Sequence, residues 1–312
     1  MTKDNIETAY LKNVYEYADK NIFLFFFSAS NAFIEYLGER NRKESTLDNT
    51  RTHLNAICDY VFMIVGKKTF AEVDEKDIYR IIGAMTGLHP HTKRTYIETF
   101  GRLLKFSTGV NIVTEMDILW SDCDTRRIFI QTEDWPRIKK KIESPTERLA
   151  IYLGAFMGLR ASEMCRIQLT DIQGDSLIIH GKGHGKDGKI AIMQIPEPVT
   201  EAIIEYMNYR SKLHLESSQL LVQTEVPWRG RPMNRSSINK ICNNISDRSG
   251  VKFTPHSLRR LFATTMYEIT GHDIETTMKL TRHEDSATLL KCYVEPSNSK
   301  KRTAMDRIST VL

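Results

Sequence analysis

Two short runs of alternating apolar residues, separated by a turn rich in glycine and lysine, most restrict how this chain can fold. Residues 176–180 and 189–195 alternate as half-buried strands do, and residues 181–188 have the composition of a hairpin turn. The segments before and after this hairpin carry the spacing of amphipathic helices instead. The sequence therefore predicts a mainly α-helical protein with one small β-sheet or hairpin.

The length of the chain favours two domains. Its 312 residues exceed the usual size of a single domain, and the polar stretch after residue 107 is suited to a linker. We therefore expect a helical domain over residues 1–110, a linker over 111–127 and a second domain over 128–312.

Helical periodicity divides both domains into short segments. In the first domain it predicts helices at residues 1–22, 29–37, 46–62, 75–85 and 93–106, with Ser45 or Thr46 as the cap of the third. In the second domain it predicts helices at residues 132–142, 148–157, 161–172, 199–211 and 234–246, with Gly158 ending the second of these.

Composition limits the classes of protein to consider. Hydrophobic residues make up 41% and charged residues 27%, as in a soluble globular protein with a real core. The net charge of +5 is consistent with a nucleic-acid partner. The five cysteines are scattered without CxxC spacing, which argues against a disulfide framework and fits a reducing cytoplasm. The apolar run at residues 22–27 is too short to span a membrane, so no membrane partner is expected.

The stretch from Thr254 to Arg260 carries the strongest chemical signal. Pro255 favours the start of a helix, and His256 and Arg259 are three residues apart, which places them on one helical face. An imidazole that moves a proton and a guanidinium that holds charge suit an anionic oxygen. A phenol near basic groups, such as the one that follows at Tyr293, is a candidate nucleophile.

These residues resemble the C-terminal box of the tyrosine recombinases, the phage integrase family. That box reads His-x-x-Arg, then a second His, then the nucleophilic Tyr, matched here by His256, Arg259, His283 and Tyr293. Upstream, residues 158–164 (Gly-Leu-Arg-Ala-Ser-Glu-Met) resemble the first-arginine box of the family, and residues 181–183 (Gly-Lys-Gly) resemble its β-hairpin lysine. The three boxes stand in family order across about half of the chain.

The resemblance implies a fold and an activity. Residues 1–110 would form a helical core-binding domain that clamps DNA, and residues 128–312 a mixed α/β catalytic domain that ends in a nucleophile helix and an exchange tail. The activity would be site-specific DNA recombination through a 3′-phosphotyrosine intermediate. It would serve either integration and excision of a mobile element or resolution of the Xer type. Double-stranded DNA would be the partner, bound by a homo-oligomer that forms a tetrameric synapse in the cytoplasm.

The catalytic residues implied by the resemblance have distinct roles. Arg160 and Arg259 would hold the non-bridging oxygens of the phosphate, and Tyr293 would attack it. His256 is placed to accept the tyrosine proton or hold the phosphate, His283 to support the phosphate, and Lys182 to protonate the leaving 5′ hydroxyl. The sequence shows no nucleotide loop and no carboxylate cluster for two metals, so we expect no cofactor and no metal; His180 and His184 lack ligand partners.

The sequence departs from the family pattern near this box. Arg282 stands where the family usually has glycine, Arg260 replaces the usual histidine after the box arginine, and the gap from His283 to Tyr293 is ten residues where many relatives have nine. The last departure bears on how the tyrosine helix docks.

Each candidate also has an ordinary structural interpretation. Arg160 is able to form a buried ion pair with Glu163, and Lys182 to serve only as a turn residue, with Lys186 or Lys189 as the acid. His283 is able to cap a helix, and Tyr293 to belong to the core. Two other functions also stay open: a catalytically silent DNA-binding regulator with the same fold, and an enzyme resembling type IB topoisomerases.

Basic residues outside the boxes are candidates for contacts to the DNA backbone, against the alternative of an ordinary solvated face. They are Arg51, His53, Lys93 and Arg94 in the first domain, and Lys139, Lys140, Arg229 and Arg231 in the second.

Overall fold

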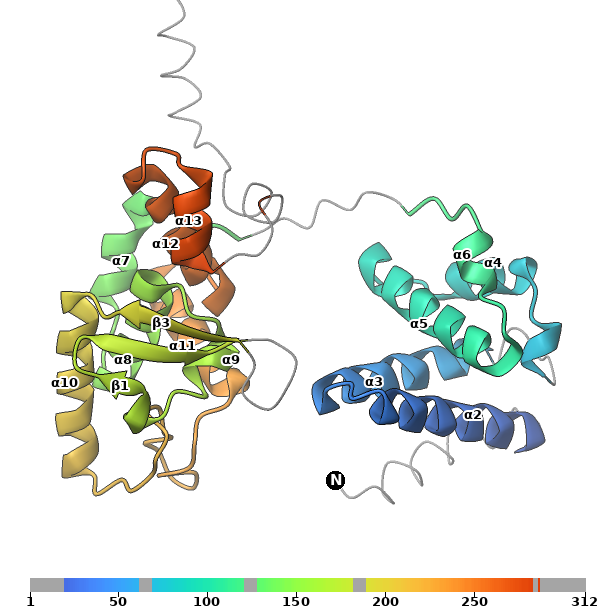
Figure 1. The fold of residues 1–312 in the computed structure, drawn as a ribbon, viewed down its shortest axis with the longest axis horizontal. Coiled ribbons are helices and arrows are strands. Elements are labelled where there is room, and N and C mark those ends of the chain that lie inside the picture. The colour runs from blue at the N-terminus through green and yellow to red at the C-terminus, as the bar shows by residue number, and fades with distance from the viewer. Residues whose placement is uncertain (1–19, 62–68, 121–127, 182–188, 283–285, 287–312) are drawn as a thin grey trace, which may run out of the picture. The chain divides into compact units, whose positions relative to one another are not determined.

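The computed structural model describes residues 20–61, 69–120, 128–181, 189–282 and 286 (Figure 1). The chain separates into two compact units, Met1–Thr125 and Arg126–Leu312. Among the described residues, the protein is mainly helical with one small antiparallel sheet, which confirms the predicted fold class. The expectations for residues 1–19, for the hairpin turn and for the region after residue 282 lie outside the described residues, apart from residue 286.

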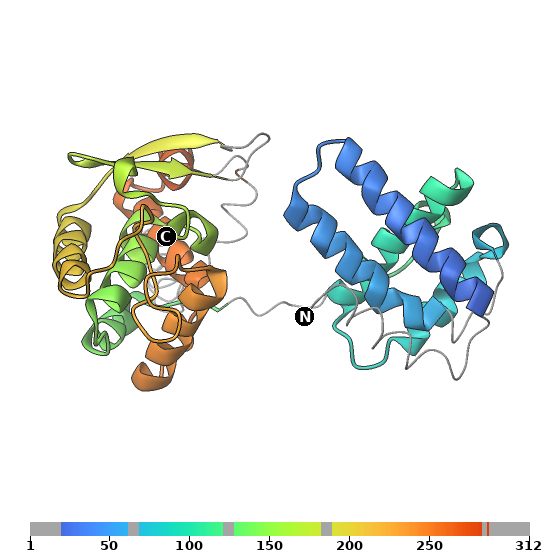
Figure 2. The same ribbon diagram turned by 90° about the horizontal axis from the view of Figure 1, so that it is seen from below.

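The first unit is built from short helices. They are α2 (Lys20–Glu39), α3 (Glu44–Tyr60), η2 (Phe70–Glu72), α4 (Glu75–Ala84), α5 (Pro90–Thr108) and α6 (Ile112–Glu115). Helices α2 and α3 lie side by side, and both contact α5 (Figures 1 and 2). Phe100 and Leu103 of α5 are fully buried and belong to the same core cluster as Leu54 and Ile57 of α3. The apolar face of α5 thus supplies part of this core.

The core of the first unit extends beyond residue 110. Val113 of α6 is buried against α5, where Gly101 leaves room for it: a Cβ on Gly101 would lie 2.9 Å from the Val113 Cβ. Ile118 and Trp120 also pack against this core. The part of the predicted linker up to residue 120 therefore packs with the helical unit.

The structure corrects three helix boundaries in the first unit. The helix predicted at 29–37 is part of the longer α2, because the apolar run at 22–27 continues it. Helix α3 begins at Glu44 after Lys43, which makes no side-chain capping bond, so neither Ser45 nor Thr46 is the cap. Helix α5 begins at Pro90, whose missing N–H suits the first helical position.

The second unit combines helices with the sheet. Its elements are η3 (Thr132–Asp134), α7 (Trp135–Lys140), α8 (Pro145–Met157), α9 (Ala161–Met164), η4 (Leu169–Asp171), β1 (Ile172–Gln173), β2 (Ser176–His180), β3 (Ile190–Gln194), α10 (Glu197–Lys212), α11 (Arg235–Ser249), α12 (Pro255–Ile269) and α13 (Ile274–Thr281). Helix α8 is nearly surrounded by core contacts and packs against α10, α11 and α12. Its apolar sequence is explained by this burial.

The hairpin predicted at 176–195 is confirmed and lies along one face of this unit (Figure 2). Strands β2 and β3 pair antiparallel, with Leu177 opposite Met193 and Ile179 opposite Ala191. Leu177 and Ile179 are buried in the core, whereas the outward-facing Ile192 is 70% exposed. The two-residue strand β1 pairs with β2 and was not predicted, because two residues are too few to show an alternating pattern.

The helix predicted at 161–172 is wrong in length. Helix α9 covers only Ala161–Met164, and a turn at residues 165–166 leads into a short stretch before η4. The N–H of Leu169 donates to Ser218 O at 2.8 Å, and the N–H of Leu220 donates to Ile167 O at 2.8 Å. These bonds join segments about fifty residues apart in sequence and replace helical bonds that local propensity favoured. No helix in the described part of the chain has the length and apolar character needed to span a membrane.

Candidate functional site

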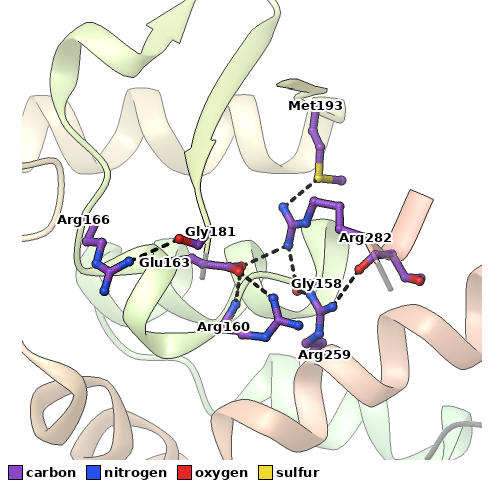
Figure 3. A network of polar contacts seen from close by, with 9 residues as sticks. Gly158, Arg160, Glu163, Arg166, Gly181, Met193, Arg259 and Arg282 are labelled. Carbon is purple, nitrogen blue, oxygen red and sulfur yellow. Dashed lines mark hydrogen bonds and ion pairs between the residues drawn. The ribbon is translucent and has the colours of Figure 1, made fainter. Parts of the chain in front are cut away.

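The site forms around Gly158, where α8 ends. Gly158 adopts the left-handed conformation, with φ 60° and ψ 30°, and its N–H donates back to Gly154 O. A Cβ at Gly158 would lie 2.3 Å from Phe262 Cδ1 of α12. Glycine is therefore required for both the backbone angle and the approach of α12. The carbonyl of Gly158 points into the network of polar contacts in Figure 3.

Arg259 enters this network from the start of the second turn of α12. Thr254 caps the helix through a reciprocal pair of bonds with Ser257, and Pro255 is the first helical residue, as predicted. The Arg259 side chain is only 1% exposed. Its Nη1 donates to Gly158 O, and its Nη2 donates to Thr281 O at 2.7 Å, at the end of α13. Arg259 thus joins the ends of two helices.

Arg160 is held from the other side by Glu163. Arg160 is the N-cap of α9, and its N–H donates to Glu163 Oε2 at 2.9 Å while its Nη1 donates to Glu163 Oε1 at 2.7 Å. The Glu163 side chain is 2% exposed, whereas that of Arg160 is 40% exposed. The ion pair considered in the sequence analysis is present, yet the guanidinium of Arg160 keeps an accessible surface.

Arg282 is the third arginine of the network. It adopts the left-handed conformation with φ 57° at the end of α13. Its Nη2 donates to Glu163 Oε2 at 3.0 Å and to Gly158 O at 3.3 Å, and its Nη1 lies 3.0 Å from Met193 Sδ of β3 (Figure 3). Arg282 therefore contacts the partner of Arg160, a partner of Arg259 and the hairpin.

The charges of this cluster shift one another's pKa values. Burial of the Glu163 carboxylate raises its pKa, but the charge of Arg282 and the hydrogen bonds and charge of Arg160 outweigh burial, and the pKa is lowered. Burial lowers the pKa of Arg282 to about 10, opposed by Glu163 and helped by the charges of Arg259 and Arg160. The three guanidinium groups and the one carboxylate of the cluster sum to a formal charge of +2. Such a cluster suits a phosphate.

The predicted site residues fall into three groups. Arg160 and Arg259 come together in one network, although 99 positions separate them, because both contact groups that Arg282 also contacts. His256 is exposed on the first turn of α12. Lys182, His283 and Tyr293 lie outside the described residues.

Residues next to two of these unplaced positions are described. Gly181 accepts a bond at 3.5 Å from Arg166 Nη1, and its N–H donates to Lys189 O at 2.8 Å. The start of the hairpin turn is thus held near α9. Thr281 lies at the end of α13, two residues before position 283, and its Oγ1 donates to Thr277 O at 2.7 Å.

Sequence reasoning did not assign Glu163 or Arg282 to the site. Glu163 appeared only as a structural alternative for Arg160, although its i, i+3 spacing was visible. Arg282 appeared only as a departure from the family's glycine. That departure was the available signal, because a residue that replaces glycine at a left-handed position must be accommodated by its side-chain contacts.

The candidate DNA contacts in the first unit already have intramolecular partners. Arg51 pairs with Asp48 at 2.8 Å and Arg94 with Glu98 at 2.7 Å, both at the surface. His53 Nδ1 lies 3.3 Å from Thr99 Oγ1, and burial together with the charge of Arg102 lowers the pKa of His53. Lys93 Nζ donates to Ile82 O at 3.4 Å. Exposed ion pairs of this kind are weak and do not prevent a phosphate contact.

The candidates in the second unit lie at its surface. Lys139 and Lys140 are exposed on α7. Arg231 lies over the Trp228 ring with 4.7 Å from its Cζ to the ring centre, and Arg229 Nη2 donates to Leu213 O at 3.2 Å. Arg260 is also held by its own unit, since its Nη1 donates to Ile128 O at 3.2 Å.

Metal and thiol chemistry find no support in the described part of the chain. Its His, Cys, Asp and Glu side chains form no group of three or more that is placed to hold a metal ion. Burial raises the pKa of Cys165 to about 11 and that of Cys242 to about 12, so both thiols are poor nucleophiles at neutral pH.

Comparison with curated proteins finds tyrosine recombinases. The chain is 29% identical to tyrosine recombinase XerA of Pyrococcus furiosus over 161 residues, and the aligned region covers 52% of this chain and 54% of that protein. It is 26% identical to tyrosine recombinase XerC of a Roseiflexus species over 279 residues, and this aligned region covers 82% of this chain and 86% of that protein. The chain spans about half the length of the XerA relatives it matches.

Solved structures share the fold. A lambda integrase dimer bound to a COC′ core site matches with a TM-score of 0.67 at 18% identity, covering 87% of this chain and 96% of that one. The Tn1549 transposon integrase in complex with transposon right end DNA matches with a TM-score of 0.70 at 16% identity, covering 91% of this chain and 99% of that one. At these identities the likeness establishes the fold.

The family itself is established by a match to a family model. The model described as the phage integrase family matches residues 128–300, which is more than half of the 312-residue chain. This range contains the arginine network and every catalytic residue that the sequence analysis named. The chain therefore belongs to the phage integrase family of tyrosine recombinases.

Proposed function

We propose that this protein is a site-specific DNA recombinase that cuts and rejoins DNA through a 3′-phosphotyrosine intermediate. The observation that carries the proposal is the arginine network. In it, Arg160 and Arg259 are linked through Glu163, Arg282 and the Gly158 carbonyl, and the cluster has a formal charge of +2. A phosphodiester gains negative charge on its non-bridging oxygens as a nucleophile attacks it. Fixed guanidinium groups stabilise that charge without rearranging.

The chemistry assigns one task to each side chain. The Tyr293 oxygen attacks the phosphorus and forms the phosphotyrosine bond, while the bond to the 5′ oxygen breaks. His256 accepts the tyrosine proton or holds the phosphate, and Lys182 delivers a proton to the leaving 5′ hydroxyl. His283 supports the phosphate. The roles of Lys182, His283 and Tyr293 are supported by the sequence motifs, and the exposed position of His256 on α12 leaves it accessible to DNA.

Rejoining follows the same path in reverse. A 5′ hydroxyl attacks the phosphotyrosine, the tyrosine leaves, and the phosphodiester bond is restored. The energy of the broken bond is kept in the protein–DNA link, so the reaction requires neither ATP nor an external cofactor. Charge stabilisation comes from arginines, which the cluster already supplies.

The oligomeric state on DNA belongs to the same proposal. Among proteins of the same fold, a lambda integrase is described as a dimer on a core site and as a tetramer on a Holliday junction. We infer that this chain also acts as a homo-oligomer on duplex DNA, with the helical first unit clamping the site and four copies forming the synapse.

Covalent capture on nicked duplex DNA tests the activity. Nicked duplexes tiled across the DNA that flanks the gene trap a cleaved strand, because the short fragment diffuses away and cannot rejoin. The intact protein should form a covalent adduct at one sequence, in the presence of EDTA as well as magnesium. Tyr293→Phe should bind the same duplex with nearly unchanged affinity and form no adduct, since only the nucleophilic oxygen is lost.

The same experiment separates the competing functions. A DNA-binding regulator gives no adduct at any sequence, and a topoisomerase-like enzyme gives adducts at many sequences. An adduct that persists in Tyr293→Phe assigns the nucleophile to another residue. Cleavage that disappears in EDTA while DNA binding is retained contradicts the arginine mechanism.

A further inference from the structure

Arg282 is the one member of the arginine network that the proposed chemistry leaves without a role. Its side chain is 14% exposed and is directed into the cluster, not towards solvent (Figure 3). The backbone at this position has φ 57°, an angle that glycine adopts at no cost and an arginine adopts against steric resistance. The position thus retains a long cationic side chain where the backbone favours glycine.

The contacts of Arg282 identify what it acts on. Its Nη2 lies 3.0 Å from Glu163 Oε2, and the same oxygen accepts the N–H of Arg160 at 2.9 Å. The other oxygen of Glu163 accepts Arg160 Nη1 at 2.7 Å. A single buried carboxylate is therefore shared by two guanidinium groups, one from α9 and one from the end of α13.

The shared carboxylate affects the net charge of the cluster. Without Arg282, Glu163 would face Arg160 alone, and the cluster of Arg160, Arg259 and Glu163 would carry a formal +1. With Arg282 the sum is +2, which matches a phosphodiester that passes from one negative charge towards two during attack. Electrostatic effects are large in such a cluster, because Glu163 is 2% exposed and little screened by water.

We propose that Arg282 neutralises Glu163, so that the charges of Arg160 and Arg259 stay available to a bound phosphate. Arg282 is then a positioning residue, since it acts through Glu163 and through the Gly158 carbonyl that it shares with Arg259. This inference rests on the proposed function for its effect on cleavage, and on the cluster alone for its effect on anion binding.

The central variant is Arg282→Gly, because glycine suits the left-handed backbone and removes only the side chain. On the nicked duplex we expect adduct formation to slow by about 100-fold, the scale at which small losses of alignment act, with duplex affinity nearly unchanged. The matched control is His272→Gly, which also removes a side chain at a left-handed position of the same unit, with φ 71°, and should behave like the wild type. Unchanged cleavage by Arg282→Gly would overturn the proposal.

A double variant separates charge from a merely structural role. In Arg282→Gly with Glu163→Gln, the carboxylate is gone together with its counter-charge, and the formal sum returns to +2. We expect this variant to recover about tenfold of the lost rate, as one restored charge interaction allows. A double variant no faster than Arg282→Gly would overturn the neutralising role.

The conservative variant adds a pH profile. Arg282→Lys keeps the charge at neutral pH, but lysine has a lower reference pKa than arginine and the same burial lowers it further. Its cleavage rate relative to the wild type should therefore fall as the pH rises, whereas the ratio for Arg282→Gly should stay constant. A ratio for Arg282→Lys that does not depend on pH contradicts the charge role.

A measurement without DNA separates this inference from the proposed function. Inorganic phosphate is titrated against the full-length protein while the NMR signals of arginine Nε–Hε groups are followed. Arg282→Gly should bind phosphate several-fold more weakly than the wild type, and the double variant should recover. Suppose that the wild type forms no adduct with DNA, while Arg282→Gly still binds phosphate more weakly than the wild type and the double variant recovers. In that case only the proposed function fails. If Arg282→Gly binds phosphate as the wild type does, the inference fails.

Discussion

At the scale of single residues, the site depends on Gly158 and Glu163, which hold the arginines of the network in place. Gly158 supplies a left-handed turn, a carbonyl shared by two arginines and room for Phe262. Glu163 is buried, yet its pKa is lowered because arginines surround it, so it stays ionised at neutral pH. The pairing of Arg160 with Glu163 is thus compatible with a phosphate-binding role: the carboxylate orients the arginine, and a second arginine offsets the carboxylate's charge.

The first prediction concerns Gly158. Replacement by alanine places a Cβ 2.3 Å from Phe262 Cδ1 and imposes a left-handed angle on a residue with a side chain. We expect the free energy of unfolding to fall by about 2–5 kcal/mol, from strain and overpacking together. The control Gly174→Ala has a similar φ of 62° but no atom within 4 Å of the added Cβ, and should lose only about 1 kcal/mol. Equal losses in urea denaturation would show that backbone strain alone decides.

At the scale of elements, three helix ends and one hairpin meet at the site. The end of α8, the start of α12 and the end of α13 are joined by Arg259, while β3 contacts Arg282 through Met193. Strand β2 of the hairpin is anchored in the core by Leu177 and Ile179. A lysine at the start of the turn, at position 182, would therefore follow a strand that is firmly held.

The second prediction assigns the leaving-group acid to this hairpin. Lys182→Ala removes a proton donor but not the arginine cluster, so cleavage of ordinary DNA should fall by about 10²–10⁴-fold. With sulfur in place of the bridging 5′ oxygen, the leaving group is a thiolate that needs no proton, and the rate should largely recover. Arg160→Ala should not recover on this substrate, because its charge acts on the non-bridging oxygens.

Two other lysines of the hairpin serve as controls for that assignment. Lys186→Ala and Lys189→Ala should cleave both substrates at rates close to the wild type. Recovery by sulfur in one of these variants, without recovery in Lys182→Ala, would transfer the role to that lysine.

At the scale of the whole molecule, the protein consists of two compact units with separate cores. The described residues of the first unit form helices and connecting loops without a strand, and the second unit carries the sheet and the arginine network. Candidate phosphate contacts occur in both units, whereas the network of the candidate site is confined to the second. We therefore expect affinity for DNA to depend on both units and cleavage chemistry to depend on the second.

The third prediction concerns assembly. In the segment from Glu295 to Leu312, which lies outside the described residues, Ala304, Ile308 and Val311 are spaced for one apolar face. A segment of this length does not fold alone and needs a surface to dock on. Deletion of residues 298–312 should reduce pairing of two DNA sites more than binding to one site, as measured by gel shifts with one and two duplexes. Equal losses would indicate that the tail packs on its own protomer.

Local sequence determined most of the helices, the hairpin and the motif residues, because these depend on short-range properties. The alternation of 176–180 and 189–195, the glycine at 158 and the proline at 255 each favour the local conformation that the structure shows. The order of the three motifs is also a property of the sequence alone, and it indicated the family to which the chain belongs.

Tertiary structure alone decided the rest. The short α9 results from backbone bonds to residues 218–220, and the core extends past residue 110 because Gly101 leaves room for Val113. The place of Arg282 in the site was equally invisible, since a residue seen as a departure from glycine becomes interpretable only once Glu163, Gly158 and Met193 surround its guanidinium. Charge balance within a buried cluster is a property of groups far apart in sequence, and folding is what brings them within reach of one another.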